Sequence, residues 1–157
     1  MAETKTKFPY RDAEIPKSKG RLVCDEELCA GCMNCMFACT INKDSAASPE
    51  LARIQMNMHT QAEFHICAQP CLQCDDPKCM RACPVGAITV DENTGARVIN
   101  EDMCIGCRSC MRACPYDPPR IRFNKVTRKC TKCDLCGGDP TCVKMCPTGA
   151  LKYVKED

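Results

Sequence analysis

One stretch near residue 55 alternates apolar and polar side chains. Its apolar positions are Ile54, Met56 and Met58, and polar residues lie between them. A period of two is typical of a β-strand that buries one face. Phe64 and Ile66 resume the apolar pattern a few residues later. The segment Leu51–Cys67 is therefore predicted to form a β-hairpin, and His59 and His65 lie on it with no ligand role assigned.

Short helices and further strands are predicted where the apolar pattern is brief. Four stretches that mix apolar residues with cysteine predict helices of one or two turns: Met33–Cys39, Met80–Cys83, Met111–Cys114 and Val143–Cys146. Two later stretches, 85–88 and 148–151, place Gly-Ala before an apolar residue. That order is typical of a turn that leads into a strand. Strand, loop, helix, turn and strand together make a compact α+β unit.

The first twenty residues differ from the rest of the chain. They are polar, contain two prolines and hold no cysteine. We expect an extended arm at residues 1–20, with a disordered tail as the alternative. The N-terminus shows no apolar stretch of the kind that serves as a secretory signal. No segment approaches the roughly 18 apolar residues of a membrane span, so we expect a chain without one.

Composition indicates an interior that ordinary side chains do not organise. Of the 157 residues only 4% are aromatic, whereas nineteen are cysteine. A chain of this length forms one domain or two very small ones. A disulfide framework is disfavoured because the number of cysteines is odd and no signal peptide is predicted. Bound metal fits better, since ligation energy becomes folding energy when the unfolded chain has no formed site.

Sixteen of the cysteines fall into four runs of four. We number the runs in chain order: Cys29, Cys32, Cys35 and Cys39; Cys71, Cys74, Cys79 and Cys83; Cys104, Cys107, Cys110 and Cys114; Cys133, Cys136, Cys142 and Cys146. Three closely spaced thiolates bind one cubane 4Fe–4S cluster, and the fourth cysteine of such a run binds a neighbouring cluster. Zinc is the alternative, but zinc sites use CxxC pairs separated by a longer loop. The runs therefore predict four 4Fe–4S clusters.

An internal repeat decides which cysteines open the fourth run. Residues 71–90 align with residues 133–154, because both read CxxC, a short turn, Pro, Cys, and then Cys-Pro before Gly-Ala. Matching Pro77 to Pro140 places the second run's opening pair opposite Cys133 and Cys136. Cys130 then becomes a spare, and it remains the alternative ligand in the fourth run.

Spacing leaves open which runs exchange their last cysteines. The first run could pair with the second, or with the fourth while the second and third pair with each other.

Gly31 and Gly106 allow tight loops that direct N–H groups at sulfur. In the last three runs a proline follows the final cysteine and is expected to stop the helix there. The first run differs, because Thr40 follows Cys39.

Two cysteines outside the runs, Cys24 and Cys67, are interpreted as small buried hydrophobic residues beside the clusters, with extra ligation as the alternative. The nine methionines are expected to pack around the clusters as adaptable apolar side chains. No nucleophile or acid–base pair stands out, so no catalytic residue is predicted.

The formal net charge is +2, and four clusters of about −2 each would bring it to about −6. Several cations gather in one later stretch: Arg108, Arg112, Arg120, Arg122, Lys125, Arg128, Lys129 and Lys132. Too few aromatic residues are interleaved with them for nucleic-acid binding. We expect these cations to compensate cluster charge first, and to form a docking face for an acidic partner second.

The runs CAGCMNCMFAC, CLQCDDPKCMRACPVGA, CIGCRSCMRACPYDPPR and KCDLCGGDPTCVKMCPTGAL resemble the four-cluster ferredoxin subunits of anaerobic oxidoreductases. Those subunits accompany dimethyl-sulfoxide reductase, formate dehydrogenase, hydrogenase and carbon-monoxide dehydrogenase systems. The resemblance implies an α+β fold of two bacterial-ferredoxin-like modules, one inserted in the other. It implies an outer module at 21–66 and 124–157 and an inner module at 67–123.

In that family the first run pairs with the fourth and the second with the third. The resemblance therefore implies four ligand sets: Cys29, Cys32, Cys35 with Cys146; Cys133, Cys136, Cys142 with Cys39; Cys71, Cys74, Cys79 with Cys114; and Cys104, Cys107, Cys110 with Cys83.

The resemblance implies a non-catalytic electron-transfer subunit. Its motifs are most similar to the small ferredoxin subunit of tungsten-dependent aldehyde oxidoreductases, so a tungstopterin enzyme and a flavin/NAD subunit or a ferredoxin are the expected partners. Formate dehydrogenase, hydrogenase or carbon-monoxide dehydrogenase systems and a cluster storage or delivery module are the alternatives. Low-potential clusters are damaged by oxygen, so an anaerobic cytoplasm is expected. Stacking of the chain on itself is a further candidate interaction.

Overall fold

The computed structural model describes residues 8–59 and 65–156 and shows a mixed α+β fold. Its helices are α1 (Asn34–Asp44), α2 (Lys78–Arg81), α3 (Ser109–Ala113) and α4 (Thr141–Lys144), with the 3₁₀ turns η1 (Pro49–Leu51) and η2 (Leu135–Gly138). Its strands are β1 (Gly20–Cys24), β2 (Gln55–His59), β3 (His65–Gln69), β4 (Ile88–Val90), β5 (Arg97–Ile99), β6 (Ile121–Asn124), β7 (Lys129–Lys132) and β8 (Leu151–Lys155). The described helices all fall short of the length and apolarity that crossing a bilayer takes.

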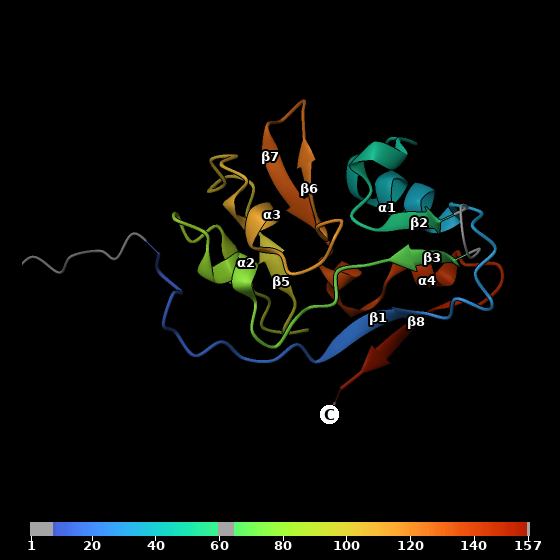
Figure 1. Cartoon of the computed structure of the whole chain (residues 1–157), viewed down its shortest axis with the longest axis horizontal. Coiled ribbons are helices and arrows are strands. Elements are labelled where there is room, and N and C mark those ends of the chain that lie inside the picture. The colour runs from blue at the N-terminus through green and yellow to red at the C-terminus, as the bar shows by residue number, and fades with distance from the viewer. Residues whose placement is uncertain (1–7, 60–64, 157) are drawn as a thin grey trace, which may run out of the picture.

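The strands pair as four two-stranded antiparallel sheets, β1–β8, β2–β3, β4–β5 and β6–β7. The β1–β8 sheet joins distant parts of the chain, with Leu22 opposite Tyr153. Helix α1 packs against α4, and α2 packs against α3; Figure 1 shows these two helix pairs in different halves of the molecule. We call the half with β1, α1, β2, β3, α4 and β8 the outer module. The half with α2, β4, β5, α3, β6 and β7 is the inner module, and it is inserted between the two parts of the outer one.

Each module has its own small hydrophobic core. Leu22, Ile54, Leu135 and Leu151 belong to the outer core, and all four are buried. The inner core contains Met80, Ile88, Ile121 and Cys130. Full burial of such aliphatic side chains contributes roughly 1.5–3 kcal/mol each. Cysteines of the four runs contribute to both cores, so the ligand positions and the packing are parts of the same interior.

Proline determines where three of the helices end. Helices α2, α3 and α4 end before Cys83, Cys114 and Cys146, so these cysteines follow the helices instead of lying on them as predicted. The ring of a proline disfavours the α conformation in the preceding residue, and Cys114 is accordingly extended, with φ −63° and ψ 127°. Because Thr40 follows Cys39, α1 continues beyond the predicted end for about one more turn.

The predicted hairpin is confirmed as β2 and β3, with Met58 opposite Ile66. Phe64, which was expected on the return strand, lies outside the described residues. The predicted module boundaries at 66/67 and 123/124 fall inside β3 and β6. Since β6 pairs with β7, the segment Ile121–Lys132 is one hairpin of the inner module.

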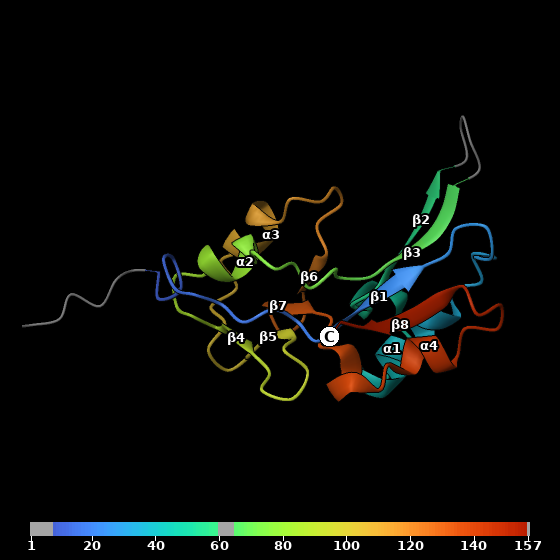
Figure 2. The ribbon, with the colours of Figure 1, turned by 90° about the horizontal axis from the view of Figure 1, so that it is seen from below.

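The described part of the N-terminal arm lies against the inner module. Residues 8–19 run along it before the chain enters β1 (Figure 2). Arg81 on α2 donates hydrogen bonds from Nη1 to three carbonyl oxygens of the arm, those of Tyr10, Arg11 and Ala13. This segment is therefore extended and bound, whereas residues 1–7 lie outside the described part of the chain.

Candidate iron–sulfur sites

Three cavities of similar size are each lined by cysteines from two runs. The second-run cavity has an empty volume of about 360 Å³, and Cys71, Cys74, Cys79 and Cys114 contribute to its wall. Cys79 lies on α2, and Cys114 follows α3. Because α2 packs against α3, the fourth thiol comes from the third run.

The third-run cavity, of about 300 Å³, is lined by Cys104, Cys107 and Cys110 together with Cys83 of the second run. Of the pairings that spacing left open, the structure thus brings the second and third runs together. Cys130 lies in the same wall and is 1% exposed.

Cys130, the predicted alternative ligand of the fourth run, lines a different cavity from the one lined by Cys133, Cys136 and Cys142. It lies on β7, and Cys133 follows that strand. A strand rises about 3.3 Å per residue, so the extended chain separates the two cysteines by roughly 10 Å. Cys130 consequently faces the inner core and the third-run cavity.

The fourth-run cavity, of about 340 Å³, is lined by Cys133, Cys136 and Cys142 together with Cys39 of the first run. Cys136 lies in the left-handed region, with φ 49°. Its N–H donates to the Asp134 carboxylate at 2.9 Å, which stabilises this turn.

The first run lies at the far end of the outer module. Cys35 is on α1, and the sulfurs of Cys29 and Cys32 are close enough to act on its thiol. Since α1 packs against α4, Cys35 and Cys146 belong to the same core region. The structure thus places the first run and the last cysteine of the fourth run at the core of the same module.

Cys24 and Cys67 lie beside the first run. Both interact with Cys29, and both are half-buried, although they were predicted to be buried. Burial raises the pKa of Cys24 to about 12, so this thiol is uncharged at neutral pH.

Burial also acts on the thiols of the runs. It raises the pKa of Cys35 to about 11 and that of Cys142 to about 12, and it raises the pKa of Cys133 well above its ordinary value. Metal binds the thiolate form. Cluster binding must therefore release protons from these side chains.

The last cysteine of each run accepts hydrogen bonds from backbone N–H groups. In three runs the N–H to sulfur distance is 3.3–3.4 Å: from Arg53 to Cys39, from Ala87 to Cys83, and from Arg120 to Cys114. Burial raises the pKa of Cys146. Hydrogen bonds from backbone N–H groups, among them that of Leu151, have the larger combined effect, and the pKa is lowered. At Cys146 these donors favour the thiolate that a metal requires.

A comparison with protein families matches residues 62–156 to the family described as "4Fe-4S dicluster domain". The match covers more than half of the sequence. The chain therefore belongs to this family. Its cofactors are accordingly 4Fe–4S clusters, and the cysteine runs are the part of the sequence that carries the family pattern.

Several relatives are also similar along most of the chain. "Aliphatic sulfonate oxidoreductase, polyferredoxin-like subunit" of Pyrococcus furiosus is 41% identical over 129 residues, which are 80% of this chain and 72% of that protein. "Protein NrfC" of Escherichia coli K12 is 37% identical over 144 residues, 84% and 63% of the two proteins. The B subunit of the anaerobic dimethyl sulfoxide reductase of Haemophilus influenzae is 36% identical over 151 residues, 85% and 72%. The chain thus spans 63–72% of the length of these relatives.

A solved structure shares the fold. The active-site complex BamBC of benzoyl-coenzyme A reductase, in complex with zinc, contains a chain that matches with a TM-score of 0.52 and 18% identity. The match covers 90% of this chain and 82% of that one. The predicted ferredoxin-like α+β fold is confirmed.

Unpartnered donors show that the second-run cavity fits the family's cofactor. Arg97, Arg120 and Lys132 contribute to its wall. Within the described residues, Nε of Arg97 and both Nε and Nη1 of Arg120 are buried without a hydrogen-bond partner. Buried donors in proteins are nearly always satisfied, and a 4Fe–4S cluster with four thiolates is an anion of about −2. The cavity suits such an anion in ligands and charge.

The cysteine sulfurs line the wall of each cavity and do not converge on a single position, as the ligands of one metal ion would. A zinc ion holds cysteine sulfurs at about 2.3 Å. In the described ranges 8–59 and 65–156, no three His, Cys, Asp or Glu side chains converge as a single ion would require. The walls of the three cavities suit a group of several atoms.

The basic stretch divides into members that lie beside the cavities and members at the tip of a hairpin. Arg120 and Lys132 line the second-run cavity, and the Arg108 guanidinium lies 3.9 Å from the ring centre of Phe123 beside the third-run cavity. Lys125 and others at the tip of the β6–β7 hairpin are exposed. Arg108, Arg120 and Lys132 are therefore the members of the stretch that line these cavities.

Sequence reasoning missed Arg97. Its side chain is fully buried, and its Nη1 and Nη2 donate to the carbonyl oxygens of Gly95 and Pro16 at 2.6 and 2.7 Å. The residue lies outside every run, in a short strand. A buried arginine in such a strand leaves no spacing signal that could have identified it.

Proposed function

We propose that this chain is a non-catalytic electron-transfer subunit that holds four 4Fe–4S clusters. The proposed ligand sets are Cys29, Cys32, Cys35 with Cys146; Cys133, Cys136, Cys142 with Cys39; Cys71, Cys74, Cys79 with Cys114; and Cys104, Cys107, Cys110 with Cys83. Clusters of this kind supply one-electron oxidation and reduction when bound. The cysteines fix their positions, and the backbone N–H groups and buried cations around them set the electrostatic environment.

The composition of the cavity walls carries this proposal. Each of the three cavities takes three cysteines from one run and the last cysteine from a partner run. Two-cluster ferredoxins share ligands in this way. The names of two of the relatives describe subunits of oxidoreductases, which supports a relay function within a complex.

Contacts between ligands support a linear order of the sites. Helix α1 carries both Cys35 of the first site and Cys39 of the fourth-run cavity. The sulfurs of Cys71 and Cys133 interact across the two modules. In the inner module, Cys79 interacts with Cys110. We infer the order first, fourth, second, third, with the first and third sites at the two ends.

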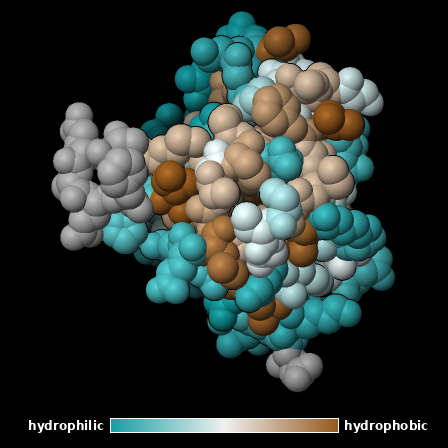
Figure 3. All heavy atoms as spheres, turned by 90° about the vertical axis from the view of Figure 1, so that its right-hand side faces the viewer, coloured by the Kyte–Doolittle hydropathy of each residue, from teal (hydrophilic) through white to brown (hydrophobic). Residues whose placement is uncertain are grey.

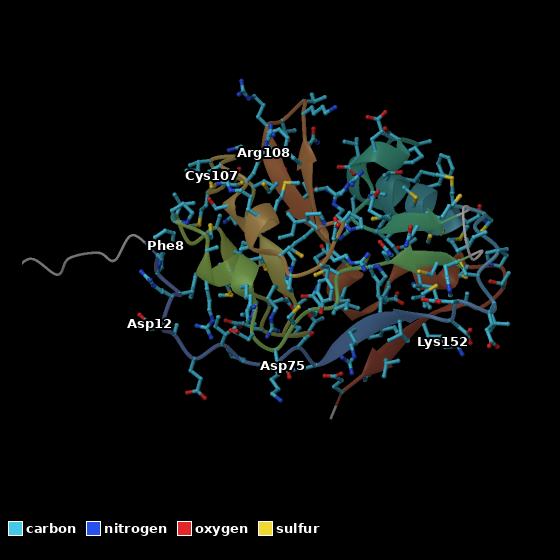
Figure 4. The ribbon with its side chains drawn as sticks, viewed as in Figure 1. Phe8, Asp12, Asp75, Cys107, Arg108 and Lys152 are labelled. Carbon is cyan, nitrogen blue, oxygen red and sulfur yellow. The ribbon has the colours of Figure 1, made fainter. Side chains whose placement is uncertain are left out.

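Both ends reach the surface. Cys32 and Cys107 are the exposed cysteines of the chain, and they belong to the first and third runs. Figure 4 shows Cys107 beside Arg108 on the inner module, far from the β8 residue Lys152. Exposed apolar side chains accompany both ends: Leu28, Phe37, Ile41 and Met145 in the outer module, and Met103 and Ile105 in the inner one. Figure 3 shows apolar side chains gathered on the outer-module end. We assign these two ends to the two redox partners.

For the catalytic partner we propose a tungstopterin-containing aldehyde oxidoreductase, on the resemblance of the segment KCDLCGGDPTCV. A flavin/NAD subunit or a ferredoxin would exchange electrons at the opposite end. Formate dehydrogenase, hydrogenase and carbon-monoxide dehydrogenase systems are the alternatives. The relative from Pyrococcus furiosus is named for an aliphatic sulfonate oxidoreductase, which adds a further class of catalytic partner.

The oxygen sensitivity of such clusters favours an anaerobic cytoplasm. Exposed ends also allow the chain to stack on itself, which would lengthen the relay. A storage or delivery module requires accessible spare ligands. Cys130 is buried, which supports the relay over storage, whereas Cys24 and Cys67 are half-buried beside the first run.

Anaerobic purification from the native source tests the proposal. We expect iron and sulfide near sixteen of each per chain, since four cubane clusters contain about that number. Dithionite should reduce the clusters reversibly, and electron paramagnetic resonance should show spin coupling between neighbouring sites. Mass spectrometry and tungsten analysis of the co-purified subunits identify the partner. A colourless chain with stoichiometric zinc would contradict the proposal.

A further inference from the structure

A buried ammonium group lies where the two modules meet. Lys132 is the last residue of β7 and is 6% exposed. It contributes to the wall of the second-run cavity, and the next residue along the chain is Cys133 of the fourth-run cavity. Lys132 therefore stands between one site of the inner module and one site of the outer module.

Hydrogen bonds fix this junction. The Nζ of Lys132 donates to the carbonyl oxygen of Arg97 at 2.7 Å. Gln73, which lies in the loop of the second run, is 2% exposed. Its Nε2 donates to the carbonyl oxygen of Cys133 at 2.8 Å, and its Oε1 accepts from the N–H of Arg97 at 2.8 Å. The side chain of Lys132 thus has little freedom to turn toward solvent.

The charge of Lys132 has sulfur neighbours instead of a carboxylate. Among the ion pairs of residues 8–59 and 65–156, none involves Lys132. The groups that act on its ammonium are the sulfurs of Cys71, Cys79 and Cys133. A buried charge without a partner is strongly destabilising. The cysteine ligands are therefore its counter-ions.

We propose that Lys132 is a positioning residue that raises the reduction potentials of the second-run and fourth-run sites together. Its fixed positive charge favours the state with one more electron at either site, because both sites lie beside the same buried ammonium. Transfer between them moves one electron from the reduced site to the oxidised one.

This inference deepens the proposed function and rests on it, because it requires clusters at both sites. Its consequence is that the ammonium raises both potentials and leaves the energy difference between the two sites nearly unchanged. An electron on either side of the junction is stabilised by the same ammonium, whereas the first and third sites lack this contact.

The test compares three variants of the full chain, anaerobically loaded with iron and sulfide. Lys132→Gln removes the charge but keeps a donor for the Arg97 carbonyl oxygen, and Lys132→Arg keeps the charge. Lys144→Gln is the matched control, because Lys144 is exposed and pairs with Asp139. Midpoint potentials are measured by redox titration followed by electron paramagnetic resonance, and iron content is determined for each variant.

We expect Lys132→Gln to lower two of the four potentials, each by at least a tenfold change in the reduction equilibrium, which is about 59 mV for one electron. Lys132→Arg and Lys144→Gln should leave all four close to those of the unmodified chain. Four unchanged potentials in fully loaded Lys132→Gln would overturn the inference while leaving the relay intact. Loss of iron from Lys132→Gln would also overturn it, since the role would then be structural. Failure of the unmodified chain to bind clusters would instead overturn the proposed function.

Discussion

Single glycines determine whether the loops that carry the cysteines can adopt their backbone conformation. In the loop of the third run, Gly106 has φ +71°, and a Cβ added there would overlap the carbonyl oxygen of Arg128. Gly149 has φ +67°, yet a Cβ added there meets open space. The two glycines share a left-handed backbone conformation and differ only in their neighbours. Side-chain crowding and backbone strain can therefore be separated experimentally.

Gly106→Ala should remove the third-run cluster, because the loop must shift to relieve the overlap with backbone. We expect a loss of about four iron atoms per chain. Gly149→Ala should cost only the strain of a left-handed residue, roughly 1–2 kcal/mol, with iron content unchanged. Iron analysis and anaerobic thermal unfolding measure both effects. Equal iron loss in the two variants would show that crowding at Gly106 is not the cause.

A second pair of substitutions tests the ligand assignment of the fourth run. Cys136→Ala should remove one cluster and about four iron atoms, because Cys136 lies in the fourth-run cavity wall. Cys130→Ala should retain all clusters and lose only about 1–2 kcal/mol of packing. The measurements are iron content and the visible absorbance per chain. The reverse pattern would make Cys130 the ligand.

At the scale of elements, the ends of helices follow from local sequence. Proline after Cys83, Cys114 and Cys146 ends α2, α3 and α4 early, and the threonine after Cys39 lets α1 continue. The sequence contained both signals. The β2–β3 hairpin was likewise predictable, because its apolar residues alternate over enough positions to reveal the period.

Other elements could not be predicted, for reasons of length and context. Strand β5 has three residues, and its Arg97 is buried only because the arm and the second-run loop cover it. The β6–β7 hairpin is rich in lysine and arginine, which resembles an exposed segment. Burial of Lys132 depends on sulfur ligands from two distant runs, and single-sequence patterns do not report such contacts.

Arg81 should hold the N-terminal arm against the inner module. Arg81→Met removes the donor that holds three carbonyl oxygens of the arm, and each such bond is worth about 1 kcal/mol. We expect limited proteolysis between residues 10 and 16 to become at least about tenfold faster. Lys78→Met is the control, because Lys78 lies on the same helix and is exposed. An unchanged cleavage rate in Arg81→Met would mean that other contacts hold the arm.

At the scale of the whole molecule, ligation should govern stability. None of the nineteen cysteines forms a disulfide, and the two cores are small. When a site is absent from the unfolded chain, the energy of metal binding contributes to folding. The modules are therefore expected to depend on their clusters more than on apolar burial.

Removal of the clusters by oxidation and chelation should unfold the chain. We expect loss of the near-ultraviolet circular dichroism signal and of a cooperative thermal transition, both restored by iron, sulfide and reductant under anaerobic conditions. The matched control is the chain treated with the same chelator without oxidant. A cluster-free chain that keeps a sharp thermal transition would contradict this dependence.

The nested arrangement also fixes an order of events during synthesis. Strand β1 cannot form its sheet until β8 has emerged from the ribosome, because β1 pairs with β8 along its whole length. Every element of the inner module has left the tunnel before then. Domains fold in the order in which the nascent chain exposes them. The inner module is consequently the scaffold onto which the outer module is later closed.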